Sequence, residues 1–329
     1  MANARTARAA GLGAFASRVV RFRATPTLVT LAVALSVLTP AALQHRAQHG
    51  DETQYVWAAT YYGHRLAHLD FSRGRGDFRD PGWTPDVYWT SASNAGTFYV
   101  YAAALGLTGQ PGPRLPFSFT DPRLQGAETQ VPSRSLAVVR LAAALCAALG
   151  LALISRRLGW KGFVATALLL LAPNVPGDLT RAWAEGPLLL GFGLCATAFG
   201  TRWFGVLCGA ATTFKLTALG LWPLILWRGA NGKLSGFKGI LFAALTWTLL
   251  MPASWRAGGP LYLVDALTFR ASQFEGQSRA NLPDVHAGIF LPSRYLLQIE
   301  VLAALALAFA LSSLASRIRV ARAPVRATG

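Results

Sequence analysis

A series of long apolar runs is the feature that most restricts what this chain can fold into. The first run, residues 26–44, holds nineteen consecutive residues without a charge. A helix of about 20 predominantly apolar residues crosses the hydrocarbon core of a bilayer. The runs therefore predict an all-α polytopic membrane protein. Six more follow between short charged connections: Ser135–Ile154, Gly162–Pro173, Glu185–Thr201, Trp203–Trp227, Gly239–Pro252 and Tyr295–Ala315.

Composition agrees with this fold class and argues against several functions. Of the 329 residues, 53% are hydrophobic and only 14% are charged, which is far from the balance of a soluble enzyme. The net charge of +17 comes from basic residues spread between the apolar runs, without a nucleic-acid recognition motif. We therefore predict contacts with anionic membrane lipids and no nucleic-acid partner. The cysteines lie inside apolar runs with neither disulfide nor metal-ligand spacing: Cys146, Cys195 and Cys208.

The run Trp203–Trp227 differs from the others because Lys215 stands at its middle. A lysine at the bilayer centre costs roughly 2.5–3.5 kcal/mol on insertion scales. A turn at Lys215 relieves that cost and returns Arg228 to the same side as Arg202. The run then supplies two spans, and the chain has about eight. Each half holds about twelve residues, or about 18 Å of helix, so we expect the turn to lie recessed in the membrane.

The basic residues also set the expected orientation, since cytoplasmic loops of membrane proteins carry an excess of Lys and Arg. Eight spans place both termini in the cytoplasm, together with the connection that holds Arg156, Arg157 and Lys161. Every acidic residue, from Asp51 to Glu300, then falls on the outer side or at its edge. The outer face is therefore the expected working face. A cleaved signal peptide is the alternative for the first run.

The spans and loops divide the chain into five parts. We predict a basic cytoplasmic tail with the first span, a long first outer loop with short interfacial helices, a membrane core of spans, a second outer loop, and a last span with a basic cytoplasmic tail. Abundant Ala and Arg with few Lys are typical of a GC-rich bacterial gene, so the expected location is the bacterial inner (plasma) membrane with a periplasmic site. In order, the parts are residues 1–44, 45–133, 134–252, 253–293 and 294–329.

Two adjacent carboxylates, Asp51 and Glu52, stand shortly after the first run in the stretch GDETQYVW. They could begin a helix, with Asp51 as the N-cap and Gln54 at the capping-box position. They could also serve chemistry, because a carboxylate at the outer mouth of a span can accept a proton from a substrate. Aromatic residues follow on a predicted interfacial helix, where a membrane belt is the alternative to binding. They are Tyr55, Trp57, Tyr61 and Tyr62, with His64 among them.

Further charged residues on the predicted outer side are candidates for substrate binding. Glu185 begins an apolar run four residues after Arg181, and the two could form a helix-end ion pair or a functional site. Lys215 could bind a phosphate as a point charge, or it could only extend its amine to the membrane surface. The second outer loop and the residue just after it add candidates without diagnostic spacing: Arg270, Arg279, His286 and Arg294.

The order of these features along most of the chain resembles the GT-C superfamily of integral-membrane glycosyltransferases, which includes protein O-mannosyltransferases and lipid A aminoarabinose transferases. Asp51 and Glu52 with Tyr55 resemble the family's acidic pair after the first span. Residues 135–158 resemble its second span, with an internal arginine and a basic end, and residues 181–190 resemble the segment that carries a second acid. The stretch GAATTFKLTALGLWPLIL looks like the family's Gly…Thr-Lys…Pro hairpin.

Two features depart from the family pattern. Asn94–Gly106 resembles a loop helix of the family but lacks the His-Pro-Pro stretch often found there. Residues 109–130 look like an insertion. Acceptor recognition by this loop therefore cannot be carried over from the family.

The resemblance implies transfer of a sugar from a polyprenyl-phosphate carrier to a glycan, lipid or protein acceptor on the outer side. It implies Asp51 as general base, Glu52 and Glu185 as orienting or acceptor-binding carboxylates, and Lys215 as a phosphate partner. No Asp-X-Asp motif and no His/Cys cluster argues for a divalent metal, and no cofactor is predicted. The other residues implied to bind substrate are Arg181, Tyr55, Arg270, Arg279, His286 and Arg294.

Three other classes stay open. An envelope polysaccharide polymerase or ligase would share the spans and outer arginines, but it would not need an acidic pair directly after the first span. A polytopic transporter would show polar residues through the span centres, which are almost entirely apolar in this sequence. A non-catalytic scaffold would leave the acidic pair without a role.

Overall fold

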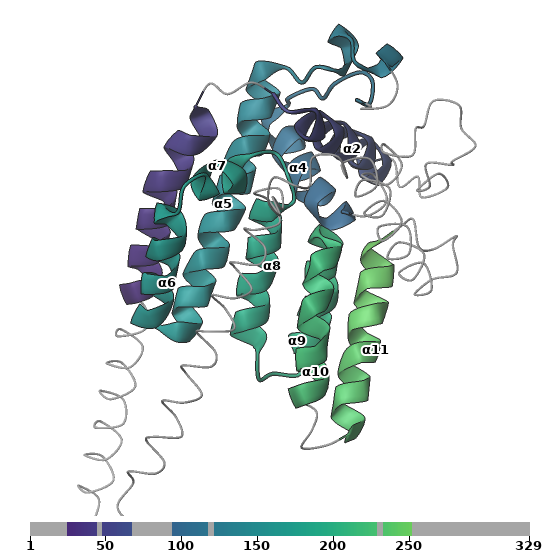
Figure 1. The fold of residues 1–329 in the computed structure, drawn as a ribbon. Coiled ribbons are helices and arrows are strands. Elements are labelled where there is room, and N and C mark those ends of the chain that lie inside the picture. The colour runs from purple at the N-terminus through teal and green to yellow at the C-terminus, as the bar shows by residue number, and fades with distance from the viewer. Residues whose placement is uncertain (1–24, 45–47, 68–93, 118–121, 229–232, 252–329) are drawn as a thin grey trace, which may run out of the picture.

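The computed structural model describes residues 25–44, 48–67, 94–117, 122–228 and 233–251 (Figure 1). Within these ranges the chain is all-helical and contains no strand. The predicted second outer loop and last span lie outside the described residues. The described elements are an unlabelled helix Thr25–Leu43, α2 (Gly50–Ala67), α4 (Ala95–Thr108), η1 (Pro122–Leu124), η2 (Ala127–Thr129), α5 (Ser133–Leu158), α6 (Trp160–Leu171), α7 (Val175–Thr180), α8 (Glu185–Ala198), α9 (Phe204–Phe214), η3 (Leu216–Leu221), α10 (Trp222–Arg228) and α11 (Lys233–Leu250).

The predicted apolar runs within the described residues all form helices. Two helical segments, Thr25–Leu43 and Ala127–Leu158, are long and apolar enough to cross a membrane. The second consists mainly of α5. Shorter apolar helices make up α4, α6, α8, α9 and α11, together with the segment of η3 and α10. The prediction of an all-α fold is therefore confirmed for the described part of the chain, with two helices of membrane length.

The apolar helices pack side by side in one bundle and alternate in direction along the chain (Figure 1). Thr30 donates a hydrogen bond from Oγ1 to Ser155 Oγ at 2.8 Å, so the first helix begins beside the last turns of α5. α5 and α8 run in the same direction, because Gly186 of α8 lies against Ala143 of α5, and Gly193, further along α8, lies against Gly150, further along α5. The starts of α5 and α8 therefore lie at one end of the bundle.

The predicted turn at Lys215 is present. α9 ends at Phe214, Lys215 has an extended backbone with φ −161° and ψ 138°, and η3 begins at the next residue. The Trp222 side chain donates from Nε1 to Thr212 Oγ1 at 3.0 Å, which ties the start of α10 to the last turn of α9. The chain thus reverses at the lysine, and the two arms of the hairpin are short.

The helices α2 and α4 lie across one end of the bundle (Figure 1). Thr97 of α4 donates from Oγ1 to the carbonyl oxygen of Phe214 at 3.0 Å. Tyr99 donates from its hydroxyl to the carbonyl oxygen of Leu250 at 3.1 Å, at the end of α11. α4 therefore covers the ends of α9 and α11, and α2 packs against α4. We call this the α2/α4 end.

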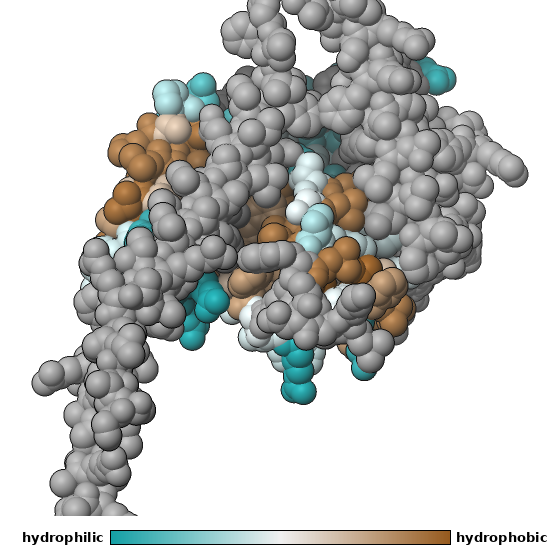
Figure 2. All heavy atoms as spheres, turned by 60° about the horizontal axis from the view of Figure 1, so that its bottom comes forward, coloured by the Kyte–Doolittle hydropathy of each residue, from teal (hydrophilic) through white to brown (hydrophobic). Residues whose placement is uncertain are grey.

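The opposite end carries exposed basic side chains, and we call it the basic end. Figure 2 brings this end forward and shows hydrophilic side chains standing out among hydrophobic ones. Large apolar side chains are exposed along the outward faces of α6 and α11, including Leu171 at 79% and Phe237 at 76%. The exposed basic residues of this end are Arg156, Arg157, Lys161, Arg202 and Lys238.

The contact between α5 and α8 depends on glycine. A Cβ atom at Gly150 would overlap the carbonyl oxygen of Leu189, and one at Gly193 would overlap the backbone of Gly150. Small residues allow two helix backbones to approach this closely, as they often do in membrane helix pairs. This contact fixes the height of α8 against α5, and so the position of the segment just before α8.

We expect Gly150→Ala to lower the free energy of unfolding by roughly 1–3 kcal/mol, because the added methyl group meets backbone that cannot rotate away. Gly106→Ala is the matched control, since Gly106 lies in α4 with open space around its Cα. That control should be neutral or stabilising by about 0.5–1 kcal/mol. Thermal unfolding of the purified protein in detergent measures both. Equal unfolding temperatures for Gly150→Ala and wild type would contradict the close packing.

Candidate functional site

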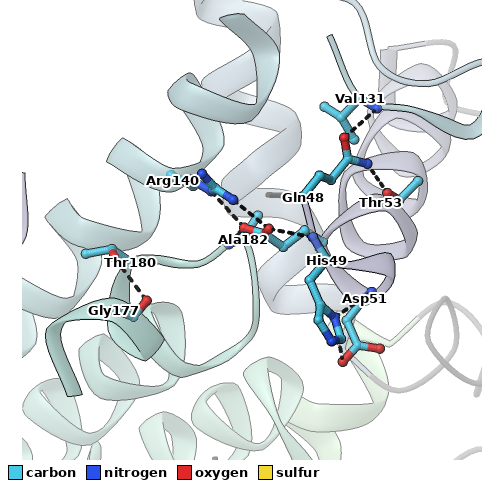
Figure 3. Close-up of polar contacts among 10 residues, drawn as sticks. Gln48, His49, Asp51, Thr53, Val131, Arg140, Gly177, Thr180 and Ala182 are labelled. Carbon is cyan, nitrogen blue, oxygen red and sulfur yellow. Dashed lines mark hydrogen bonds and ion pairs between the residues drawn. The ribbon is translucent and has the colours of Figure 1, made fainter. Parts of the chain in front are cut away.

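Glu52, at the α2/α4 end, is fully buried and accepts four hydrogen bonds. Arg140, one third of the way along α5, donates from Nε to Glu52 Oε1 at 2.8 Å and from Nη2 to Oε2 at 2.7 Å. The backbone N–H of Ala182 donates to Oε1 at 3.0 Å, and that of His49 donates to Oε2 at 3.1 Å. Figure 3 shows Arg140, Ala182 and His49 around this carboxylate. We call these four residues the Glu52 latch.

The latch holds Glu52 as a carboxylate. Burial alone raises the pKa of Glu52, but the hydrogen bonds and charge of Arg140 and the N–H groups of Ala182 and His49 together lower it below its usual range. Each carboxylate oxygen accepts two hydrogen bonds, so all of the roughly four acceptor positions of the group are used. Glu52 therefore joins α2, α5 and the segment before α8, with no position left to accept a substrate's proton.

The prediction that Asp51 caps α2, with Gln54 at the capping-box position, is wrong. The helix begins at Gly50, which makes His49 the capping residue and places Asp51 in the first turn. Glu52 fills the capping-box role, because its Oε2 accepts the His49 N–H three residues back. The Gln54 side chain instead donates to the carbonyl oxygen of Phe117 at 3.1 Å. The helix therefore starts two residues earlier than an Asp51 cap predicts, and Glu52 is held there by its bonds to His49, Arg140 and Ala182.

Asp51 stands beside His49 and is partly exposed. Its Oδ2 lies 3.6 Å from His49 Nδ1, and its backbone N–H donates to the same nitrogen at 3.2 Å (Figure 3). The side chain of Asp51 is 18% exposed and that of His49 is 43% exposed. Of the two carboxylates in the predicted pair, Asp51 is therefore the accessible one.

A row of side chains leads from Asp51 to the segment before α8. The His49 ring meets the Trp183 ring edge to face, with centroids 5.5 Å apart. The Arg181 guanidinium lies over the same indole, 4.8 Å from its centroid. We call Asp51, His49, Trp183 and Arg181 the outer row. It brings Arg181 into the same neighbourhood as the acidic pair, which the sequence separates by well over a hundred residues.

Glu185 and Lys215 meet at the same end of the bundle. Lys215 Nζ donates to Glu185 Oε1 at 2.6 Å, and the side chains are 18% and 4% exposed respectively. The turn after α9 thus carries the amine to the first residue of α8. The predicted alternative of an Arg181–Glu185 pair at i, i+4 on one helix is wrong, because α8 begins at Glu185 and Arg181 lies outside it.

The remaining predicted site residues fall into two groups. Tyr55 joins α2 to the start of α4, because its hydroxyl accepts a hydrogen bond from Asn94 Nδ2 at 3.0 Å and its ring meets that of Phe98. It lies on the same helix as Asp51. The other group lies outside the described residues and consists of Arg270, Arg279, His286 and Arg294.

Sequence reasoning missed three members of this site. It noted the internal arginine of residues 135–158 only as part of a family resemblance, although a charge within an apolar run is expensive and predicts a partner. That signal could have paired Arg140 with an acidic residue. His49 and Trp183 carried no comparable signal, because each is recognised only by its neighbours in space. Among the described residues, no group of three or more His, Cys, Asp or Glu side chains is placed to hold a metal ion.

Comparison of the chain with models of protein families, with curated proteins and with solved structures finds no match.

Proposed function

We propose that this chain is a polytopic membrane glycosyltransferase of GT-C type. It takes a sugar from a polyprenyl-phosphate carrier and transfers it to an envelope glycan, lipid or protein acceptor at the outer face of the bacterial inner membrane. One observation carries the proposal: a partly exposed carboxylate, Asp51, lies in one row of contacting side chains with Arg181, which comes from a distant part of the chain. Acid and base groups at the edge of an apolar bundle are costly unless they serve a purpose.

The distribution of charge supports the orientation. The exposed Lys and Arg of the short connections lie at the basic end, as in cytoplasmic loops, whereas exposed Arg114, Arg123 and Arg134 lie in or beside the long connection before α5, to which the charge rule applies less strongly. The described acidic residues instead lie in or beside α2, η2, α7 and the start of α8, which belong to the other end. Exposed apolar side chains between the two ends suit contact with lipid. The α2/α4 end is then periplasmic, where lipid-linked sugars and envelope acceptors meet.

Cysteine labelling tests the orientation in a background without Cys146, Cys195 and Cys208. We expect Glu128→Cys, exposed in η2, to react in intact spheroplasts with a membrane-impermeant thiol reagent. Lys161→Cys, exposed at the start of α6, should react only after permeabilisation. Both sites are accessible in the structure, so the comparison isolates sidedness. Labelling of Lys161→Cys from outside, or protection of Glu128→Cys, would contradict the proposed orientation.

The chemistry follows from the cluster. The acceptor hydroxyl gives its proton to the Asp51 carboxylate as its oxygen bonds to the anomeric carbon of the donor sugar. The bond between that carbon and the carrier phosphate oxygen breaks, and the phosphate leaves with the electron pair. Positive charge from Arg181 stabilises the departing phosphate, while Lys215 holds Glu185 at the start of α8. Glu52 does not touch substrate and instead positions Asp51 against the segment that holds Arg181.

A transfer assay with purified protein tests the function. The protein in nanodiscs is incubated with polyprenyl phosphates that carry radiolabelled mannose, arabinose, galactose, glucose or an aminosugar. Envelope extract from a deletion strain supplies the acceptor, and mass spectrometry of that envelope identifies the missing glycan. We expect one donor to label the extract. Absence of transfer from all donors, with an intact envelope in the deletion strain, would refute the proposal.

A further inference from the structure

Two hydrogen-bond donors in the outer row have no acceptor among the residues that the structure describes. Within those residues, Arg181 Nε and Trp183 Nε1 are both buried and make no hydrogen bond. The Trp183 side chain as a whole is only 7% exposed. Buried polar groups in proteins are paired in the great majority of cases, because an unpaired donor loses its hydration without compensation. Two such donors on neighbouring side chains indicate a place where a ligand with acceptor atoms belongs.

The segment that carries these donors is held rigidly. The backbone N–H of Ala182 is bound by Glu52 in the latch, and the backbone N–H of Trp183 donates to the carbonyl oxygen of Arg181 at 2.7 Å. The hydroxyl of Tyr101 donates to the carbonyl oxygen of Trp183. The guanidinium of Arg181 is further fixed by its stack on the indole. Both donors are thus oriented before a ligand arrives, which lowers the entropic cost of binding.

Charge identifies the class of ligand. Of the cations in this cluster, Arg140 is neutralised by Glu52 and Lys215 by Glu185. Arg181 has no carboxylate within salt-bridge distance among the described residues, and its guanidinium lies over the uncharged Trp183 ring. One uncompensated positive charge with two fixed N–H donors matches an oxyanion of charge −1. A phosphodiester has that charge and several acceptor oxygens.

We infer that Arg181 and Trp183 form the binding site for the phosphodiester of the donor lipid, and that Lys215 acts through Glu185 without touching the phosphate. The identification of the ligand as a lipid carrier rests on the proposed function, whereas the oxyanion site itself does not. The Trp183 ring also contacts His49, which neighbours Asp51. A phosphodiester bound here lies at one end of the outer row, with the proposed base at the other.

Equilibrium binding to full-length protein in nanodiscs of neutral lipid tests the site. The probe is tritiated farnesyl methyl phosphate, a phosphodiester of charge −1, with farnesol and inorganic phosphate as competitors. We expect saturable binding that excess unlabelled diester displaces and farnesol does not. Arg181→Gln should weaken binding by more than tenfold and Trp183→Phe by about tenfold, since Phe keeps the stacking ring but lacks the N–H donor.

The chain offers a matched control at the basic end. Arg202 stacks over Trp203 at 5.3 Å, in a pair that is similar but exposed. Arg202→Gln and Trp203→Phe should leave probe binding unchanged. Thermal unfolding checks that each variant is folded. If Arg181→Gln does not fold, Arg181→Lys replaces it, and an intermediate loss of affinity is expected because the charge remains while the Nε donor is gone.

Wild-type affinity in both Arg181→Gln and Trp183→Phe would overturn the inference. Displacement of the probe by farnesol would also overturn it. Displacement by inorganic phosphate at the concentration at which the unlabelled diester displaces the probe would show a site for free phosphate instead of a lipid. The two proposals fail separately. If the variants lose probe binding but the wild-type protein transfers sugar from no donor, the oxyanion site is supported and the glycosyltransferase proposal is refuted. If the wild-type protein transfers sugar but the variants bind the probe normally, the glycosyltransferase proposal is supported and the oxyanion site is refuted.

Discussion

Asp51→Asn is expected to abolish sugar transfer and to leave the protein folded. The amide cannot accept the proton of the acceptor hydroxyl, and loss of a general base typically costs about 10²–10⁴-fold in rate. The structural effect should be small, because Asp51 lies in the first turn of α2 and does not cap it. There the helix dipole favours a negative charge by only about 0.3–1 kcal/mol. The measurement is turnover of labelled polyprenyl-phosphate sugar, with thermal unfolding as the folding check.

Glu128→Gln is the matched control for this loss. Glu128 is an exposed carboxylate in η2 at the same end of the bundle, so removing its charge alters the field near the site without removing the proposed base. Its turnover should equal that of wild type. An Asp51→Asn protein within about threefold of wild type would leave the mechanism without a base, since that ratio corresponds to only about 0.7 kcal/mol of barrier.

The second large effect is expected at the Glu52 latch. Glu52→Gln leaves the Arg140 guanidinium buried without a counter-charge, and removing one partner of a buried ion pair costs about 3–5 kcal/mol. We expect a marked fall in unfolding temperature and, because the amide keeps only one of the two acceptor oxygens that anchor α2 to Arg140 and Ala182, a loss of transfer as well. Measuring the two together distinguishes a positioning role from a catalytic one. A Glu52→Gln protein as stable as wild type but inactive would contradict the assignment of Glu52 as a structural anchor.

A double-variant cycle isolates the pair. Glu52→Leu with Arg140→Met removes both charges, so it should regain much of the stability that either single change loses.

The pH dependence of stability gives an independent check of the Glu52–Arg140 pair. The folded-state pKa of Glu52 is lowered, so its stabilising effect is complete above the unfolded-state pKa of about 4.3 and is lost as pH falls through the folded value. Wild type should therefore lose stability below about pH 4 more steeply than the double variant.

The sequence predicts those structural features whose free-energy cost or gain can be judged from a single run of residues. The turn at Lys215 is of this kind, because a charge in the middle of an apolar stretch is costly wherever the rest of the chain lies. The helical runs and the interfacial helix that begins near Asp51 are also local. The grouping of Asp51, Glu185 and Lys215 at one end follows from alternating spans. Each of these predictions depends on hydropathy, length and the positions of charged residues along the sequence.

What the sequence does not predict is which charge meets which. Glu52 and Arg140 are 88 residues apart, and their pairing depends on how α2 docks against α5. The same docking shifts the helix cap from Asp51 to His49. Lys215 and Glu185 are 30 residues apart in the sequence. They meet because the turn after α9 and the first residue of α8 lie at the same level along the bundle axis. Such heights are set by backbone contacts like that of Gly150 with Leu189, which no residue pattern reveals.

The short hairpin at Lys215 has a consequence for the lipid around the protein. α9 has 11 residues, about 16 Å of helix, whereas the helix Thr25–Leu43 has 19, about 28 Å. In the proposed orientation the hydrophobic height of the bundle is therefore uneven. The bilayer is then expected to thin along the side of α8 and α9. Under the proposed function, thinning on this side would bring the headgroup level, where a carrier's phosphate lies, closer to the start of α8 and to Arg181. Membrane thickness, together with the chemistry of the donor, then governs access to the site.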